Sequence, residues 1–269
     1  MKIMPFSSFL ATLFLGACVT VPGTNSSQLN FFSPQQESKM GAEAYNEMLK
    51  KEKEAKNPRI KAMLLRVGSR ISQVAEARHR AGFQWEFKLI ESKEANAFCL
   101  PGGKVAFYTG ILAPLENEAA MAMVMGHEVA HATLRHGGQR MSQAYFAQGL
   151  VIGSSLLGTA FIKDPKYRNL SMAALGLGVS VGVILPFSRS NEAEADAYGL
   201  EYAAAAGYEP SEAAAFWSRF SKKNAGKEPP AFLSTHPSNQ SRINNLSTLK
   251  EKVEPIYLRS PQYGLGEQI

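Results

Sequence analysis

The sequence predicts a mostly α-helical α+β fold, in which an active-site helix and a glutamate-bearing helix pack over a small β-sheet. Three observations predict it: apolar residues recur at helical spacing over most of the chain, strand-like alternation is confined to residues 84–109, and a His-Glu-x-x-His sequence lies in an apolar helical segment. The 269 residues, 45% hydrophobic and 19% charged, suffice for one sizeable domain and exclude wholesale disorder.

The first seventeen residues have the pattern of a bacterial signal peptide. Lys2 precedes an apolar run, Phe6 to Ala17, that is too short for an ordinary membrane-spanning helix. The run ends in Leu-Gly-Ala-Cys18, which resembles a lipobox, so we expect Cys18 to be lipidated and to become the mature N-terminus; an ordinary secretory signal with a chance cysteine is the alternative. An aspartate directly after the lipidated cysteine would resemble an inner-membrane retention signal, but this chain has Val19 at that position. We therefore expect a lipid anchor on the periplasmic face of the bacterial outer membrane.

The folded domain is expected to begin with two helices. Ser33-Pro34 and Asn57-Pro58 each place an N-cap residue before a proline at the first helical position. The first helix should run to about Asn57 and the second to about Arg80. This divides the chain into a signal peptide (1–17), a Ser/Thr/Asn/Gly-rich tether (18–32), a metallopeptidase domain (33–258) and a C-terminal tail (259–269).

The small sheet and the remaining helices follow in order. A half-buried strand is expected over 84–91, and a hairpin is expected from residues 97–100 and 104–109 around Pro101-Gly102-Gly103. A helix should run from about Asn117 to His136 and end at Gly137-Gly138. Further helices are expected over residues 189–206, 210–223 and 238–253.

Two uncharged apolar segments, 144–162 and 169–188, lie between the central helix and the last third of the chain. Each is barely long enough to cross a bilayer. We expect a helical hairpin that packs against the catalytic core or lies at a membrane surface.

The charge pattern and the thiols exclude two classes of function. The net charge of +6 is spread along the chain, without a cluster of basic and aromatic residues, so we expect no nucleic-acid partner; anionic lipid headgroups remain possible partners of a basic surface. If Cys18 is lipidated, Cys99 is the one remaining thiol, and no intramolecular disulfide can form. We expect Cys99 to be a buried, inert thiol and not a redox switch.

The segment His127-Glu128-Val129-Ala130-His131 carries the chemistry. Positions i and i+4 of a helix differ by about 40° in azimuth and about 6 Å in rise, so both imidazoles can reach one metal ion. Glu128, one residue on, can address a water at the metal without binding the metal, as in H-E-x-x-H metallopeptidases. The flanking residues are apolar, so the helix is buried, where unpartnered histidines would be costly.

A third metal ligand must come from elsewhere in the chain. Glu192 and Asp196 share one helical face, which suits a carboxylate ligand and a second carboxylate that orients a ligand imidazole. Glu194 lies about 200° round the helix from Glu192, and we expect it to contribute little. His136 is expected to face another side of the HExxH helix.

Four motifs and an arginine follow one another in an order that resembles a known protease family: Asn96–Gly103, His127–His131, Ser188–Asp196, Ser234-Thr235-His236-Pro237 and Arg242. They resemble the gluzincin family that includes the HtpX and BepA bacterial envelope proteases, the CAAX prenyl proteases and the mitochondrial Oma-type protease. The resemblance covers about residues 34–253. Because we see neither tetratricopeptide repeats nor N-terminal transmembrane helices, the chain is most similar to the short lipoprotein members.

The resemblance implies that His127, His131 and Glu192 bind one zinc ion per chain and that Glu128 is the catalytic base. It also implies a role for His236, and two roles stay open. His236 could be a fourth ligand that closes the site, or a catalytic residue that stabilises the tetrahedral oxyanion.

The sequence thus predicts a zinc metalloendopeptidase that acts on misfolded or misassembled envelope proteins, a substrate class taken from the family. An extended substrate could add as a strand to the sheet edge formed by 96–109. The alternative is a periplasmic chaperone or scaffold that uses the apolar segments 144–162 and 169–188. The intact ligand set argues against a pure scaffold, because a scaffold would be free to lose it.

Overall fold

The computed structural model describes residues 18–21, 24, 27–147, 165–177, 185–237 and 240–269. The predicted mostly helical α+β fold is confirmed. The helices are α2 (Pro34–Leu49), α3 (Pro58–His79), α4 (Leu112–Leu115), α5 (Glu118–Thr133), α6 (His136–Ala147), α8 (Pro165–Met172), α9 (Arg189–Ala205), α10 (Ser211–Asn224), α11 (Ala231–Thr235) and α12 (Gln240–Tyr257).

A three-stranded sheet contains the expected hairpin. Its strands are β3 (Glu86–Ile90), β4 (Ala97–Leu100) and β5 (Lys104–Tyr108), in the order β3-β5-β4. β5 is parallel to β3 and antiparallel to β4, and Gly102 and Gly103 make the turn with φ of 87° and 82°. β4 is therefore an edge strand. A second, two-stranded sheet pairs β1 (Cys18–Thr20) with β2 (Ser27–Leu29).

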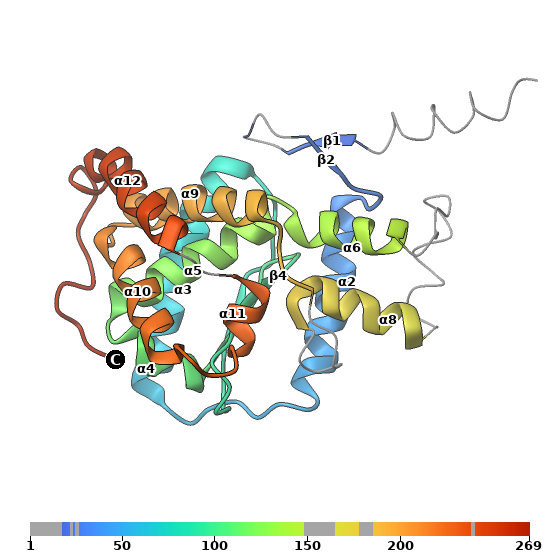
Figure 1. Cartoon of the computed structure of the whole chain (residues 1–269), viewed down its shortest axis with the longest axis horizontal. Helices are drawn as coiled ribbons and strands as arrows, with labels where there is room; N and C mark the ends of the chain where they lie inside the picture. Colours follow the sequence, from blue (N-terminus) through green and yellow to red (C-terminus); the bar gives the residue numbers. More distant parts are fainter. Residues whose placement is uncertain (1–17, 22–23, 25–26, 148–164, 178–184, 238–239) are drawn as a thin grey trace, which may run out of the picture.

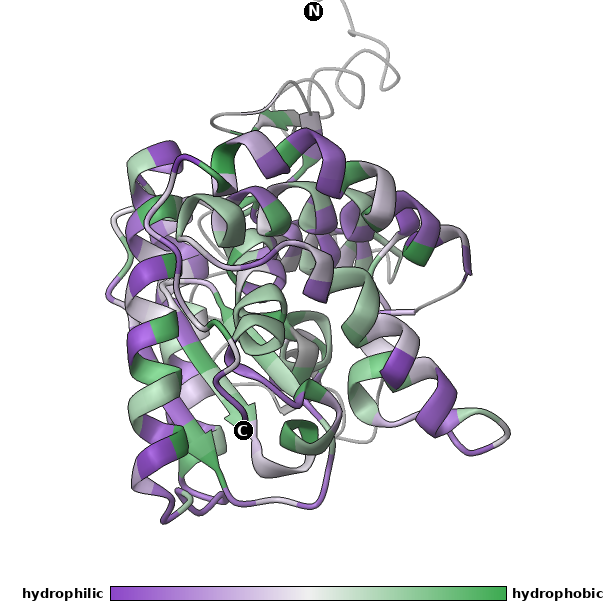
Figure 2. Cartoon of the chain, turned by 90° about the vertical axis from the view of Figure 1, so that its left-hand side faces the viewer, coloured by the Kyte–Doolittle hydropathy of each residue, from purple (hydrophilic) through white to green (hydrophobic). Residues whose placement is uncertain are grey.

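Helix α5 lies at the centre of the molecule. Figure 1 shows α9 alongside it, α10, α11 and α12 on one side, and α2, α6 and α8 grouped on the other. Every residue of α5 is buried, and its apolar side chains belong to the main hydrophobic core. In Figure 2 the outer helices carry hydrophilic residues, while the strands are mostly hydrophobic. The helix with the His-Glu-x-x-His sequence is thus enclosed on all sides.

Two glycines let α5 and α9 approach closely. A Cβ atom on Gly126 would collide with the carbonyl oxygen of Gly199, and one on Gly199 would lie 2.6 Å from the backbone nitrogen of His127. Without side chains at the crossing, the two backbones touch one residue before the first histidine of the motif. This contact brings the first turns of α9 within reach of the α5 histidines.

Helix α2 starts at the predicted residue but ends at Leu49, earlier than the expected Asn57. The chain leaves the helix because residues 53–55 pair with the end of β3. The amide of Ala55 donates to the Leu89 carbonyl at 2.8 Å, and the amide of Glu91 donates to the Lys53 carbonyl at 2.7 Å. Backbone pairing with the sheet thus replaces the last two turns of the predicted helix.

The central helix also ends before the predicted residue. It stops at Thr133, the chain turns at Arg135 with φ of 61°, and α6 begins at His136. Gly137-Gly138 therefore lies inside the first turn of α6 and does not end a helix, contrary to expectation. A Cβ atom on Gly138 would collide with the Glu37 carboxylate, so glycine is required there for packing.

Both ends of the described chain contact the region around α5. Gln28 Nε2 donates to the Leu134 carbonyl at 3.1 Å, within the segment expected as a tether. In the C-terminal tail, the Ile269 amide donates to the Glu116 carbonyl at 2.8 Å, and the Glu118 amide donates to the Glu267 carbonyl at 2.9 Å. Residues 259–269 thus lie along the N-terminus of α5.

The two apolar segments are described only in part, because residues 148–164 and 178–184 lie outside the described residues. Within them, residues 144–147 belong to α6, and residues 169–177 belong to α8 and to the π-helical turn η2 (Ala173–Leu177). None of the helices in the described part of the chain is long and apolar enough to cross a membrane. The part of the predicted hairpin that would join the two segments lies outside the described residues, as does the signal peptide.

Candidate metal centre

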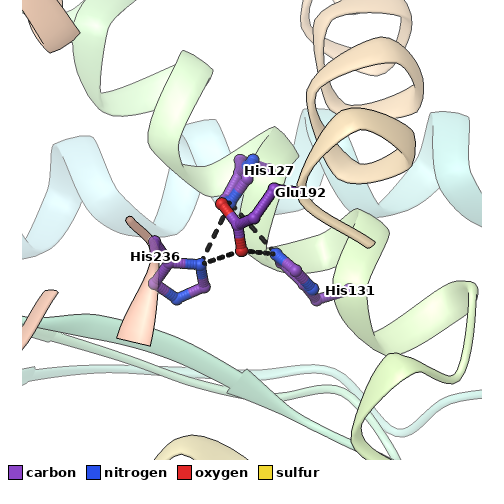
Figure 3. A group of neighbouring side chains, drawn as sticks. All are labelled: His127, His131, Glu192 and His236. Carbon is purple, nitrogen blue, oxygen red and sulfur yellow. Dashed lines mark hydrogen bonds and ion pairs between the residues drawn. The ribbon is translucent and has the colours of Figure 1, made fainter. Parts of the chain in front are cut away.

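Four buried side chains converge between α5 and α9 (Figure 3). His127 and His131 come from α5, Glu192 from the first turn of α9, and His236 from the residue that ends α11. One ligand atom of each lies within 4.8 Å of the others. The i, i+4 spacing brings the two histidines together as predicted, and the structure adds Glu192 and His236 to them.

The distances between the possible ligand atoms suit a single small metal ion. His127 Nε2 lies 3.1 Å from His131 Nε2 and 3.2 Å from His236 Nδ1. Glu192 Oε1 lies 3.3 Å from His131 Nε2 and 3.0 Å from His236 Nδ1. Ligands bound tetrahedrally to zinc at about 2.0–2.1 Å stand about 3.3–3.4 Å apart. Imidazole and carboxylate are also donors that zinc accepts.

The buried oxygens of the site provide an independent test of this fit. Glu128 Oε1 and Glu192 Oε2 are both buried and accept no hydrogen bond from the described residues. Glu192 Oε2 has ion-pair contacts instead, at 2.5 Å with Arg242 and at 3.6 Å with His127. Arg242 thus neutralises Glu192 Oε2, whereas Glu128 Oε1 remains a buried carboxylate oxygen without a hydrogen bond, which is rare in native proteins and leaves it able to accept one from a water at the ligand set.

The electrostatic surroundings keep the candidate ligands in the states that a metal needs. Burial lowers the pKa of His131 well below its usual value, so the imidazole stays neutral with a free lone pair. Burial alone would raise the pKa of Glu192, but the charges of His236 and Arg242 outweigh it and hold that pKa well below its usual value.

Asp196 lies one helical turn beyond Glu192, on the same face, as predicted. Its Oδ1 atom is 3.0 Å from Nδ1 of His127, the nitrogen on the far side of the ring from the ligand set. Arg242 binds both oxygens of Asp196, at 2.6 and 2.7 Å, and its guanidinium lies 4.0 Å above the Trp217 ring. The carboxylate thus contacts His127 while the arginine holds the carboxylate.

Glu128 is buried beside the four converging side chains. Burial raises its pKa, partly opposed by the charges of His236 and His127. Its Oε1 atom lies 3.4 Å from Nε2 of His236. A carboxylate with a raised pKa and an oxygen without a hydrogen bond is suited to accept a proton.

The expectation about His136 is wrong. His136 does not face away from the site: it is fully buried, and its Nδ1 lies 3.0 Å from Nδ1 of His131. Oε2 of Glu194 lies 3.1 Å from Nε2 of His136, and the expectation that Glu194 contributes little stays a prediction. The error arose because the helical faces were assigned on an unbroken helix, whereas the turn at Arg135 brings His136 back toward His131.

Phe187 is a further neighbour of the site that the sequence did not indicate. Its ring stacks on that of His131, with centroids 4.0 Å apart and planes at 28°. The Arg140 guanidinium lies 3.5 Å from the Phe187 ring centroid. Burial lowers the pKa of Arg140 to about 9. Phe187 directly precedes Ser188, the N-cap of α9, and so belongs to no periodic pattern that could have identified it.

A sequence model of peptidase family M48 matches residues 54–250, which include every side chain of the candidate metal centre. The chain belongs to peptidase family M48. The predicted relationship to gluzincin proteases is therefore confirmed, and the metal of this family is zinc.

Relatives within the family come from mitochondria and from bacteria. The chain is 31% identical over 228 residues to the mitochondrial metalloendopeptidase OMA1 of Schizosaccharomyces pombe, covering 84% of this chain and 64% of that protein. It is 26% identical over 258 residues to the beta-barrel assembly-enhancing protease of Escherichia coli, covering 94% of this chain and 52% of that protein. The chain thus spans roughly half to two thirds of the length of these relatives.

Proposed function

We propose that the chain is a zinc-dependent metalloendopeptidase in which His127, His131 and Glu192 hold the zinc ion and Glu128 is the catalytic base. The observation that carries the proposal is the buried set of two imidazoles and a carboxylate, with the Glu128 carboxylate next to it. Zinc, when bound, polarises the peptide carbonyl and makes a water more acidic.

Glu128 and Asp196 have different roles in the proposed reaction. Glu128 takes a proton from the attacking water and passes it to the nitrogen of the leaving amine. Burial supports this role, because it raises the pKa of Glu128 toward the range in which a carboxylate both accepts and returns a proton. Asp196 holds the ring of His127 in position through the contact between Oδ1 and Nδ1.

For His236 we propose that it closes the site as a fourth ligand. Its Nδ1 atom lies at the same distances from His127 and Glu192 as the other ligand atoms do from one another, 3.2 and 3.0 Å. Three protein ligands leave a position for water, and a fourth imidazole removes it. His236→Ala should then raise peptide turnover and self-cleavage. A fall in turnover of about 10²–10³-fold with zinc retained would instead assign His236 to oxyanion stabilisation.

A substrate would bind as an additional strand on β4. The amide of Tyr108 donates to the Asn96 carbonyl at 3.0 Å, so by the alternation of an antiparallel ladder the backbone groups of Ala97 and Cys99 point away from β5. The Ala97 amide donates to Oδ1 of Asn96, which leaves the Ala97 carbonyl and the backbone groups of Cys99 for a substrate. Backbone groups at such an edge can pair with an extended peptide of almost any sequence. An unfolded segment is extended, which supports unfolded proteins as the substrate class.

We further propose that the protein is lipid-anchored through Cys18 and faces the periplasm, where it acts on misfolded or misassembled envelope proteins. The lipobox-like sequence before Cys18 and the beta-barrel assembly-enhancing protease of E. coli among the relatives support this location. Cys18→Ala should abolish lipid labelling and release the protein from the membrane fraction. A variant that still fractionates with the outer membrane would contradict the anchor.

The test of the proposed activity is Glu128→Gln. The variant should bind stoichiometric zinc, because Glu128 is not a ligand, and should lose turnover of an unfolded protein such as casein by at least 10²–10⁴-fold, the usual loss on removing a general base. Turnover is measured beside wild type with and without a chelator. Zinc loss in the variant would make Glu128 a ligand, and retained chelator-sensitive turnover would refute its role as the base. Wild-type protein without chelator-sensitive turnover would refute the peptidase assignment.

The rival function, a chaperone or scaffold, rested on the apolar segments 144–162 and 169–188. Most of their residues lie outside the described part of the chain, and no contact of the described residues favours this function. Wild-type protein that prevents aggregation of an unfolded porin equally well with and without bound zinc, and cleaves none of it, would favour the scaffold.

A further inference from the structure

His136 and Glu194 lie behind His131, on the side of its ring that faces away from the converging ligand atoms. His131 Nε2 points into the ligand set, 3.1 Å from His127 Nε2, while its Nδ1 is 3.0 Å from Nδ1 of His136. The other ring nitrogen of His136, Nε2, is 3.1 Å from Oε2 of Glu194. A carboxylate and two imidazoles thus form one row that ends at the ligand set.

The chemistry of the three groups allows one arrangement of hydrogens along this row. A carboxylate accepts hydrogen bonds and donates none, so His136 must donate from Nε2 to Glu194. A neutral His136 then has Nδ1 as its acceptor, and His131 must donate from Nδ1. This leaves the lone pair of His131 on Nε2, the atom that faces His127 and Glu192.

We propose that His136 and Glu194 form a hydrogen-bond relay that fixes the tautomer and the ring orientation of His131, with His136 as a positioning residue and not a ligand. The inference rests on the proposed role of His131 as a zinc ligand. Partners of this kind keep a metal-binding imidazole in the right tautomer and increase its basicity. Here the carboxylate acts through a second imidazole.

The surrounding packing holds His136 in place. Arg135, which makes the turn before it, donates to Oε1 of Glu37 at 2.8 Å and to the Phe32 carbonyl at 2.6 Å. His136 itself is fully buried, and each of its two ring nitrogens has one of the relay partners within hydrogen-bonding distance, His131 on one side and Glu194 on the other. Glu194 is one third exposed, so the relay reaches from the ligand set to the surface.

The test compares three single substitutions. His136→Phe keeps a ring of similar size but removes the acceptor, and it should weaken zinc affinity by about 10–100-fold. His136→Asn keeps an acceptor close to the position of Nδ1 and should restore most of that loss. The matched control is His79→Phe, because His79 is another buried histidine, which lies on α3 and is bonded to Tyr202; the zinc affinity of this variant should equal that of wild type.

Zinc affinity is measured by competition with a chelator on the full chain, and the thermal unfolding of each zinc-free variant is recorded beside it. Proton–nitrogen NMR of histidine-labelled protein gives a second readout. In zinc-loaded wild type, His131 should carry its hydrogen on Nδ1 and exchange it slowly, and His136→Phe should speed this exchange. If His136→Phe fails to fold, Glu194→Ala replaces it and should show a smaller loss of zinc affinity.

Unchanged zinc affinity in His136→Phe, or in Glu194→Ala where that variant is used, would overturn the relay, and so would a hydrogen on Nε2 of His131. Equal losses of affinity in His136→Phe and His136→Asn would also overturn it, because packing alone would then explain both. A protein that binds zinc as expected in all variants but hydrolyses no peptide would overturn the proposed function and leave the relay intact.

Discussion

His127 and His131 leave the same face of α5, one helical turn apart, yet they are supported in different ways. Behind His127 stands a carboxylate, Asp196, at 3.0 Å, and Arg242 holds that carboxylate with two hydrogen bonds. Behind His131 stands the imidazole of His136, also at 3.0 Å, and the carboxylate of Glu194 follows one step further out.

The two sets of supporting side chains differ in the solvent exposure of their charged groups. The side chains of Asp196 and Arg242 are 6% and 8% exposed, so the charges behind His127 are buried with the core. Glu194 is 33% exposed, so the charge behind His131 is in contact with solvent. Breaking the first support should therefore destabilise the whole fold, whereas breaking the second should weaken metal binding and leave the fold largely intact.

The largest effect is expected from Glu192→Ala, which removes the carboxylate that both histidines share. The variant should retain no stoichiometric zinc and no peptidase activity, because it removes the one negatively charged ligand and leaves the Arg242 guanidinium beside the metal position without its Glu192 partner. Metal analysis after dialysis measures this. Glu201→Ala is the control, since Glu201 lies on the same helix in an ion pair with Arg78 and should bind zinc normally. Stoichiometric zinc in Glu192→Ala would mean that the three imidazoles of His127, His131 and His236 suffice to hold the ion.

Asp196→Asn tests the buried support of His127 and should have the next largest effect. Zinc affinity should fall by about 10–100-fold. The free energy of unfolding of the zinc-free protein should fall by about 3 kcal/mol, the lower end for a broken buried ion pair, because Arg242 keeps its contact with Glu192. Denaturant titration measures it. If Glu194→Gln destabilises the fold as much, the distinction between the two supports fails.

The pH dependence sharpens the same comparison. Burial by itself would raise the pKa of Asp196. The contacts with Arg242 and His127 outweigh burial and hold that pKa below its usual value. The resulting stabilisation is present above the unfolded-state pKa and is lost as the pH falls through the lower, folded-state pKa. The stability difference between wild type and Asp196→Asn, measured on zinc-free protein, should thus be largest near neutral pH and shrink below about pH 3–4. A constant difference would show that Asp196 does not act through its charge.

The smallest effect is expected from Phe187→Leu. This change removes the ring that stacks on His131 but leaves both hydrogen-bonded supports in place. The free energy of unfolding should fall by about 0.5–1.5 kcal/mol, the usual contribution of an aromatic pair. Zinc affinity, measured by chelator competition, should fall less than in Asp196→Asn. A larger loss would make stacking, and not hydrogen bonding, the main support of His131.

The sequence predicted the relative positions of site residues correctly only where the residues lie on one unbroken helix. Glu192 and Asp196 were paired correctly, because α9 is unbroken between them. His136 was misplaced, because one residue with positive φ, Arg135, ends the periodicity on which the assignment relied. A turn of this kind requires no glycine or proline, so no residue type marked it in advance.

Long-range contacts were the other limit. The N-cap and proline at Ser33-Pro34 predicted the start of α2, since capping is local, but the end of α2 depends on pairing with β3, about forty residues away in the chain. Arg242 was noticed as part of a motif, yet its contacts with Glu192 and Asp196 could not be derived from spacing. Local chemistry predicted elements, and tertiary contacts decided where they end and meet.

The glycine crossing of α5 and α9 extends the functional constraint on the chain beyond the residues that do chemistry. Neither Gly126 nor Gly199 has a side chain to contribute, but any larger residue at either position would collide with the opposite backbone and move Glu192 away from the histidines. Under selection for zinc binding, these two positions should accept almost no substitutions, although neither touches the metal. A survey of natural variants that counted only ligands and catalytic groups would therefore underestimate how much of the chain the metal centre prevents from changing.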